Sequence, residues 1–262
     1  MIDIEQLISL VKKAGEAVLK FYDFPKVEYK EDNSPVTQAD FASEKIILDS
    51  LSKISNFGIL SEETTDDKKR LKQEYVWVVD PLDGTKDFIQ KTGEFSIMVG
   101  LAKNGEPIMG VVYQPVCKKL CYAVKGKGSF IRADNGIDKQ LRVSSINELQ
   151  VSRLVVSRNH LSEKDAIYAE KMGLKNYVKA GSNGVKMCLI AQNKADLFFN
   201  TGTGMGEWDS CAPQIILTEA GGMVTGTDGR PLLYNKSEPK NKFGIVASNG
   251  ILHKEILGVI IQ

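Results

Sequence analysis

Two aspartates of this sequence stand where a continuous apolar run ends in a turn. Residues 76–79 (V-W-V-V) have the pattern of a strand that is buried on both faces. Pro81 follows Asp80 and is expected to end the strand, because proline has no N–H to donate, and Gly84 permits a tight turn. Asp80 and Asp83 can therefore converge on one point. Carboxylate ligands of this kind suit a hard cation such as Mg²⁺.

An isolated D-P-x-D-G favours a simpler interpretation, an Asx-turn with a helix cap. The longer run D-P-L-D-G-T (80–85) after a buried strand is more specific, and it resembles the metal-binding motif of the inositol monophosphatase and fructose-1,6-bisphosphatase superfamily. This resemblance implies Mg²⁺-dependent hydrolysis of small phosphate monoesters. The continuation Lys86-Asp87-Phe88 looks more like the 3'(2'),5'-bisphosphate nucleotidase branch than the inositol branch.

A second match lies in the C-terminal half. Residues 206–213 (G-E-W-D-S-C-A-P), followed by E-A-G-G at 219–222, resemble the C-terminal signature of the superfamily. Alone, Asp209 could be an acid that caps a helix and interacts with its dipole. Beside the first motif, the resemblance implies that Asp209 is a metal ligand.

Two further acids gain a role from the same resemblance. Glu62 belongs to S-E-E at 61–63, where the superfamily places a metal ligand, although adjacent acids at a strand end are often only solvated. Asp40 ends P-V-T-Q-A-D, a stretch that resembles the one whose aspartate helps to activate the attacking water. The alternative for Asp40 is a capping acid worth about 1 kcal/mol.

The resemblance thus implies a complete site with two Mg²⁺ ions and a third, weaker ion near Glu62. Inhibition by Li⁺ is implied as well. Asn200 stands where some bacterial members carry an arginine, so a second phosphate would depend on Lys186. The implied residues are Asp40 and Thr85 for activation of water; Glu62, Asp80, the Leu82 carbonyl, Asp83 and Asp209 for metal; and Gly84, Thr85, His160, Ser182, Lys186 and Asp209 for substrate.

Composition limits the class of protein. The chain has 262 residues, 42% of them hydrophobic, which suffices for one large domain or two closely packed ones. A formal net charge of +1 predicts neither nucleic-acid wrapping nor adsorption to membranes. The acidic start M-I-D-I-E-Q and the lack of a long apolar run indicate a cytoplasmic protein without a signal peptide. The cysteines, predicted to be buried free thiols, are Cys117, Cys121, Cys188 and Cys211.

The first half of the chain must position most of the acids. Apolar residues at helical spacing predict a helix that Asp3 caps and that runs to about Tyr22, and Asp40 is expected to open a second helix. The charged residues 64–73 are predicted to form an exposed, mobile loop over the site. The predicted strands, which from 95 onward form an antiparallel meander, are 57–60, 76–79, 95–103, 107–114, 120–124 and 128–131.

The second half alternates between strands and helices. It ends in a helix from Leu252 on which His253 is expected to be exposed. The predicted strands are 151–157, 177–180, 195–200 and 243–248, and the helices before the last one are 162–173, 184–192 and 210–220.

These elements predict an α+β and α/β protein, a layered αβαβα sandwich with an antiparallel N-terminal sheet, two helices and a mixed C-terminal sheet. The expected subdomains are 1–145 and 146–262, with the site between them. The favoured function is hydrolysis of adenosine 3',5'-bisphosphate to AMP and phosphate by a monomer or homodimer. The alternatives are an inositol or sugar-phosphate phosphatase and an inactive protein that senses nucleotide or metal.

Overall fold

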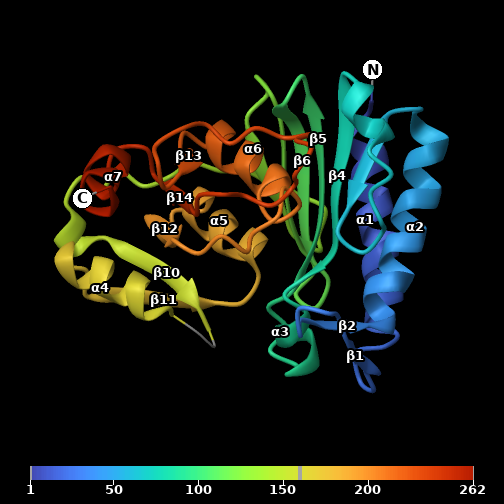
Figure 1. The fold of residues 1–262 in the computed structure, drawn as a ribbon, viewed down its shortest axis with the longest axis horizontal. Coiled ribbons are helices and arrows are strands. Elements are labelled where there is room, and N and C mark those ends of the chain that lie inside the picture. The colour runs from blue at the N-terminus through green and yellow to red at the C-terminus, as the bar shows by residue number, and fades with distance from the viewer. Residues whose placement is uncertain (1, 159–160, 262) are drawn as a thin grey trace.

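The computed structural model describes residues 2–158 and 161–261, and its helices and sheets alternate in layers (Figure 1). The first layer is a helix pair, α1 (Ile4–Leu19) and α2 (Gln38–Ile54). The Asp3 side chain caps α1, as predicted, by accepting from the Glu5 N–H at 3.0 Å. The N-cap of α2 is Thr37, so this helix begins before Asp40, which lies in its first turn.

A sheet of seven strands packs against this helix pair. From one edge to the other, the strands are β3 (Gly58–Ser61), β4 (Tyr75–Asp83), β5 (Ser96–Lys103), β6 (Glu106–Gln114), β7 (Lys119–Val124), β8 (Ser129–Arg132) and β9 (Asp138–Gln140). The pairs from β4 to β9 are antiparallel, which confirms the predicted meander. Strand β3 is parallel to β4, because residues 62–74 cross back before β4 begins.

The second sheet is mixed, as predicted. Its strands, in order, are β11 (Asn176–Ala180), β10 (Arg153–Ser157), β12 (Leu197–Asn200), β14 (Ile245–Ser248) and β13 (Met223–Gly226). Strand β10 runs parallel to β11 and β12, whereas β14 is antiparallel to β12 and β13.

The remaining helices complete the layers. Helices α5 (Asn183–Ala191) and α6 (Cys211–Glu219) lie between the two sheets, and α4 (Glu163–Lys171) and α7 (His253–Ile260) cover the outer face of the second sheet (Figure 1). Separate apolar cores join successive layers: Trp77 with α1 and α2, Met98 with α5 and α6, and Phe199 with α4 and α7. The predicted αβαβα sandwich is therefore confirmed. Within the described ranges, no helix is long and apolar enough to cross a bilayer.

Several local expectations were wrong. Residues 64–73 include a short 3-10 helix, η1 (Lys69–Lys72), and the Arg70 side chain is buried rather than exposed. His253 is also buried, because its ring faces the Thr225 and Ser248 hydroxyls. Cys117 is exposed, whereas the other cysteines are buried free thiols as predicted. The expected loop before α2 contains a hairpin of β1 (Val27–Tyr29) and β2 (Pro35–Thr37).

Candidate active site

Strand β4 carries the first two aspartates of the site. The sequence predicted that the strand would end at Asp80 and Pro81. In the structure, β4 continues to Asp83. Its register against β5 shifts between the pairs Asp80–Met98 and Asp83–Ser96. Pro81 lies within this irregularity, where a bulge tolerates a residue that cannot donate to the ladder. The bulge places both carboxyl groups, which are almost fully buried, at one end of the large sheet.

Asp209 completes a close group of carboxylates. One oxygen atom from each of Asp80, Asp83 and Asp209 lies within 4.8 Å of the other two. Asp209 precedes α6, whose N-cap is Ser210. Its carboxylate accepts from Gly206 N–H at 2.6 Å and from Asn183 Nδ2 at 3.0 Å. Neither donor belongs to the first turn of α6, so these contacts do not match the capping alternative.

The N-terminal end of α5 holds Asp83. Oδ2 of Asp83 accepts from the Ser182 hydroxyl and from the Gly184 N–H, the latter at 2.9 Å. The Ser182 Oγ also lies 2.7 Å from Ser96 Oγ and caps α5 through the Val185 N–H. Ser182, which was predicted to contact substrate, thus orients a carboxylate of the cluster.

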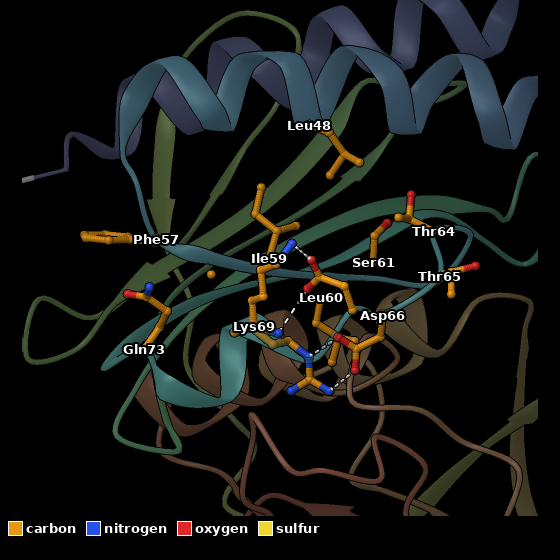
Figure 2. A pocket seen from close by; sticks show the side chains of 13 residues that line it. Leu48, Phe57, Ile59, Leu60, Ser61, Thr64, Thr65, Asp66, Lys69 and Gln73 are labelled. Carbon is orange, nitrogen blue, oxygen red and sulfur yellow. Dashed lines mark hydrogen bonds and ion pairs between the residues drawn. The ribbon is translucent and has the colours of Figure 1, made fainter.

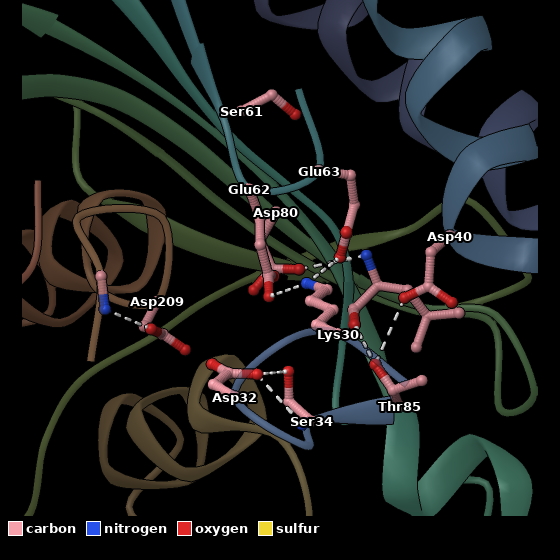
Figure 3. Close-up of polar contacts among 12 residues, drawn as sticks. Lys30, Asp32, Ser34, Asp40, Ser61, Glu62, Glu63, Asp80, Thr85 and Asp209 are labelled. Carbon is pink, nitrogen blue, oxygen red and sulfur yellow. Dashed lines mark hydrogen bonds and ion pairs between the residues drawn. The ribbon is translucent and has the colours of Figure 1, made fainter. Parts of the chain in front are cut away.

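Glu62 lies beside this group and is paired with a lysine (Figure 3). The Lys30 ammonium donates to Glu62 at 3.0 Å and to Glu63 at 2.7 Å. Burial, followed by the charge of Asp209, raises the pKa of Glu62 to about 8. Sequence reasoning did not identify Lys30, which stands at the start of a polar stretch with no apolar period to mark its partner.

The aspartates share an unfavourable electrostatic environment. Burial and the charges of Glu62 and Asp83 raise the pKa of Asp80 well above its usual range. Burial also raises the pKa of Asp83, against the lowering effect of its hydrogen bond from Ser182. Burial and Asp83 raise the pKa of Asp209 to about 6. Buried acids that converge in this way are stabilised by a cation, and a set of oxygen ligands fits a hard divalent ion such as Mg²⁺.

A hydroxyl–carboxylate pair stands next to the cluster (Figure 3). Thr85 Oγ1 donates to Asp40 Oδ1 at 3.2 Å, and the Leu82 carbonyl lies 3.4 Å from the same hydroxyl. The other oxygen of Asp40 accepts from the Thr37 N–H and hydroxyl at 2.8 and 2.7 Å. Asp40 therefore forms a capping box and contacts Thr85 at the same time. Burial raises the pKa of Asp40.

The remaining residues that were predicted to bind substrate are Lys186, Gly84 and His160. Lys186 is buried, donates to Asn183 Oδ1 at 3.1 Å and lies 5.3 Å from the Phe198 ring centroid. Burial lowers the pKa of Lys186, whereas the charges of nearby aspartates, Asp83 first, raise it. Gly84 has a φ of +92° and precedes the short helix α3 (Thr85–Ile89). His160 lies outside the described residues.

Comparison with known proteins places this arrangement in a family. A model described as the inositol monophosphatase family matches residues 3–261. A protein of Salmonella typhimurium named 3'(2'),5'-bisphosphate nucleotidase CysQ is 36% identical over 241 residues, which cover 90% of this chain and 95% of that protein. The protein of the same name from Escherichia coli K12 is 35% identical over 240 residues, with the same coverage.

Solved structures agree with these relatives. The CysQ of Bacteroides thetaiotaomicron superposes with a TM-score of 0.80 and 32% identity, covering 94% of this chain and 96% of that one. An inositol monophosphatase (IMPase) of Thermotoga maritima has a TM-score of 0.84 and 27% identity, covering 98% of this chain and 96% of the other. The layered fold and the acids at the end of the large sheet agree with these matches, and this chain belongs to the inositol monophosphatase family.

Proposed function

We propose that this chain is a Mg²⁺-dependent 3'(2'),5'-bisphosphate nucleotidase that converts adenosine 3',5'-bisphosphate to AMP and phosphate. The observation that carries the proposal is the convergence of Asp80, Asp83 and Asp209 in a chain whose relatives bear this activity in their names. The family is generally Mg²⁺-dependent. We further propose that the protein acts in the cytoplasm as a monomer or homodimer. Its chain would form two subdomains, with the boundary at residue 145.

The metal ligands follow from the family motifs and the positions of the acids. Glu62, Asp80 and the Leu82 carbonyl would hold one Mg²⁺, and Asp80, Asp83 and Asp209 would hold another, with a third, weaker ion near Glu62. When bound, Mg²⁺ supplies the positive charge that the phosphate ester and the attacking water need. Lys30 donates to Oε1 of Glu62, so Oε2 of the same carboxylate would be the oxygen that holds the ion.

Thr85 and Asp40 would act on the attacking water. The Thr85 hydroxyl already donates to Asp40, so its lone pairs are free to accept from a water on the cluster side. Asp40 has a raised pKa, which makes it a better proton acceptor than an ordinary exposed aspartate. A proton from the water can thus pass through Thr85 to Asp40. The amides of Gly84 and Thr85 would hold the phosphate.

A second phosphate would distinguish the nucleotide from other esters. Lys186 is a cation within the electrostatic influence of Asp83, Asp87 and Asp209, and Asn183 orients its ammonium. Ser182 and, from the sequence motif alone, His160 are proposed for the same substrate region. A charge-assisted contact of this kind is worth about 1.5–3 kcal/mol, or roughly 10- to 100-fold in kcat/KM if it is realised in the transition state.

The test compares three substrates side by side with and without Mg²⁺. Adenosine 3',5'-bisphosphate is expected to exceed AMP and inositol 1-phosphate in kcat/KM by about tenfold or more. Lys186→Met should narrow that margin, whereas Lys194→Met, on the surface, should preserve it. A higher value for inositol 1-phosphate would favour an inositol or sugar-phosphate phosphatase. The absence of any Mg²⁺-dependent phosphate release would favour the inactive sensor.

A further inference from the structure

The Arg70 side chain is buried at the junction of two distant segments. Its guanidinium donates to both Asp66 carboxylate oxygens, at 3.1 and 2.7 Å, and thereby folds residues 66–70 into a compact turn. It also reaches a turn of the C-terminal half, where it donates to Asn235 Oδ1 at 2.8 Å and to the Lys236 carbonyl at 3.0 Å. The Asn235 amide returns a hydrogen bond of 3.2 Å to the Arg70 carbonyl.

The turn at Asn235 and Lys236 also binds the carboxylate of Glu207. Glu207 is fully buried, and its two oxygens accept from the Asn235 N–H at 2.6 Å and from the Lys236 N–H at 2.9 Å. The Glu207 carbonyl accepts from the N–H of Ser210, the N-cap of α6, and from the N–H of Cys211, the first residue of that helix. In the chain, Asp209 lies between Glu207 and the two residues, Ser210 and Cys211, whose amides donate to the Glu207 carbonyl. Its position against Asp80 and Asp83 therefore depends on the turn that Arg70 holds.

The segment that contains Arg70, residues 64–73, is not packed against β3 along its whole length. A cavity of about 390 Å³ separates parts of residues 64–73 from β3, and Asp66 and Lys69 lie on its wall (Figure 2). Its lining includes Ser61, which directly precedes Glu62, but none of the three aspartates of the cluster. The stem of Arg70 packs closely against Gly58 of β3, and its guanidinium adds four hydrogen bonds that anchor the segment.

We infer that Arg70 is a positioning residue for metal binding. It joins the segment that follows Glu62 to the turn that fixes Glu207 and hence Asp209, so it holds acids from the two halves of the chain at the separation that one metal cluster requires. This inference rests on the metal ligands proposed above. Among the described residues, the Arg70 guanidinium donates to Asp66, Asn235 and Lys236 and to none of the proposed metal ligands.

The test measures Mg²⁺ affinity by calorimetry and by the Mg²⁺-dependent rise in Tm. Arg70→Met removes the guanidinium but keeps the stem. Lys69→Met is the matched control, because Lys69 lies on the same turn and, among the described residues, forms its ion pair with exposed Asp67. Partners that orient metal ligands typically change affinity 10- to 100-fold, so Arg70→Met should raise the Mg²⁺ Kd by about tenfold and Lys69→Met by less than about twofold. At saturating Mg²⁺, kcat and the substrate KM should remain close to the wild-type values.

A second variant keeps the test decisive if Arg70→Met does not fold. Asn235 has a φ of +64°, which glycine adopts without strain, and Asn235→Gly retains the main-chain N–H that Glu207 accepts. This variant should also raise the Kd by more than twofold. Folded Arg70→Met or Asn235→Gly protein with a Kd within about twofold of wild type overturns the inference. Wild-type protein that binds no Mg²⁺ overturns the proposed function, and this inference with it.

Discussion

The substitution Asp209→Asn should make the metal-free protein more stable while it abolishes activity. Burial and Asp83 raise the pKa of Asp209 from 3.8 to about 6. A carboxyl with a raised folded-state pKa binds more protons in the folded than in the unfolded protein between those two values. The free energy of unfolding therefore falls as pH rises through this interval and is fully reduced above it.

The expected gain follows from these values. A shift of about two pKa units costs about 3 kcal/mol at pH 8, and asparagine removes that charge with little change of shape. Both Asp209 oxygens accept hydrogen bonds, from Gly206 and Asn183, so the Asn amide group must lose one of them at a cost of about 1 kcal/mol. The net gain is about 2 kcal/mol, or roughly 4–8 °C in Tm for a chain of this size.

Thermal unfolding in EDTA at pH 8 and pH 5 measures this effect. The variant should have the higher Tm at pH 8. At pH 5, where Asp209 is largely protonated in the folded state, the free-energy cost of the Asp209 charge falls to roughly half, and the Tm difference should shrink accordingly. Saturating Mg²⁺ should reverse the order, because only the wild type gains stability from binding. A lower Tm for the variant in EDTA at pH 8 would refute the reasoning and give Asp209 a structural role through its hydrogen bonds from Gly206 and Asn183.

Four other outcomes are expected. Asp80→Asn should abolish Mg²⁺-dependent phosphate release, whereas Asp134→Asn, an exposed partner of Lys118, should retain it; substantial activity of Asp80→Asn would contradict the ligand assignment. Thr85→Ala should lower kcat by about 10²-fold with little change in KM, and a change in KM alone would count against a role in proton transfer. Li⁺ in the millimolar range should inhibit phosphate release, and a rate unaffected by tens of millimolar Li⁺ would separate this chain from the sensitive branches. Because burial lowers the pKa of His253 to about 4, the unfolded chain binds the extra proton between pH 6.5 and 4. Between pH 7 and pH 4.5, the free energy of unfolding should therefore fall by about 2.5 kcal/mol more in the wild type than in His253→Asn, as denaturation at the two pH values would measure.

The sequence was sufficient for the elements with a clear period and for the acids within specific motifs. The apolar run before Asp80, the antiparallel meander and the alternating second half all appear in the structure near their predicted positions. The convergence of Asp209 with the β4 aspartates was also expected, because its motif accompanied theirs. Short strands such as β9 were missed, since β9 is exposed along its whole length and has no apolar alternation.

The failures arose where tertiary contacts override local chemistry. Pro81 looked like the end of a strand, but a bulge absorbs it and β4 continues. Arg70 looked exposed within a charged run, but partners more than 160 positions away compensate its burial. Lys30 resembled an ordinary loop lysine until the structure placed Glu62 and Glu63 against it. No pattern within a short window of sequence contains these long-range pairings.

The raised pKa values connect the fold to metal binding. The acids that lower the stability of the metal-free protein are the ones proposed to bind Mg²⁺, so a bound ion would offset the repulsion that folding creates. A cation binds the deprotonated carboxylates, so its binding must release the proton that Glu62 holds near neutral pH and, below about pH 6, the proton of Asp209 as well. Mg²⁺ affinity should consequently rise with pH up to about 8. Lys30 acts in the same direction as the ion, because its charge and its hydrogen bond lower the pKa of Glu62 against the effect of burial.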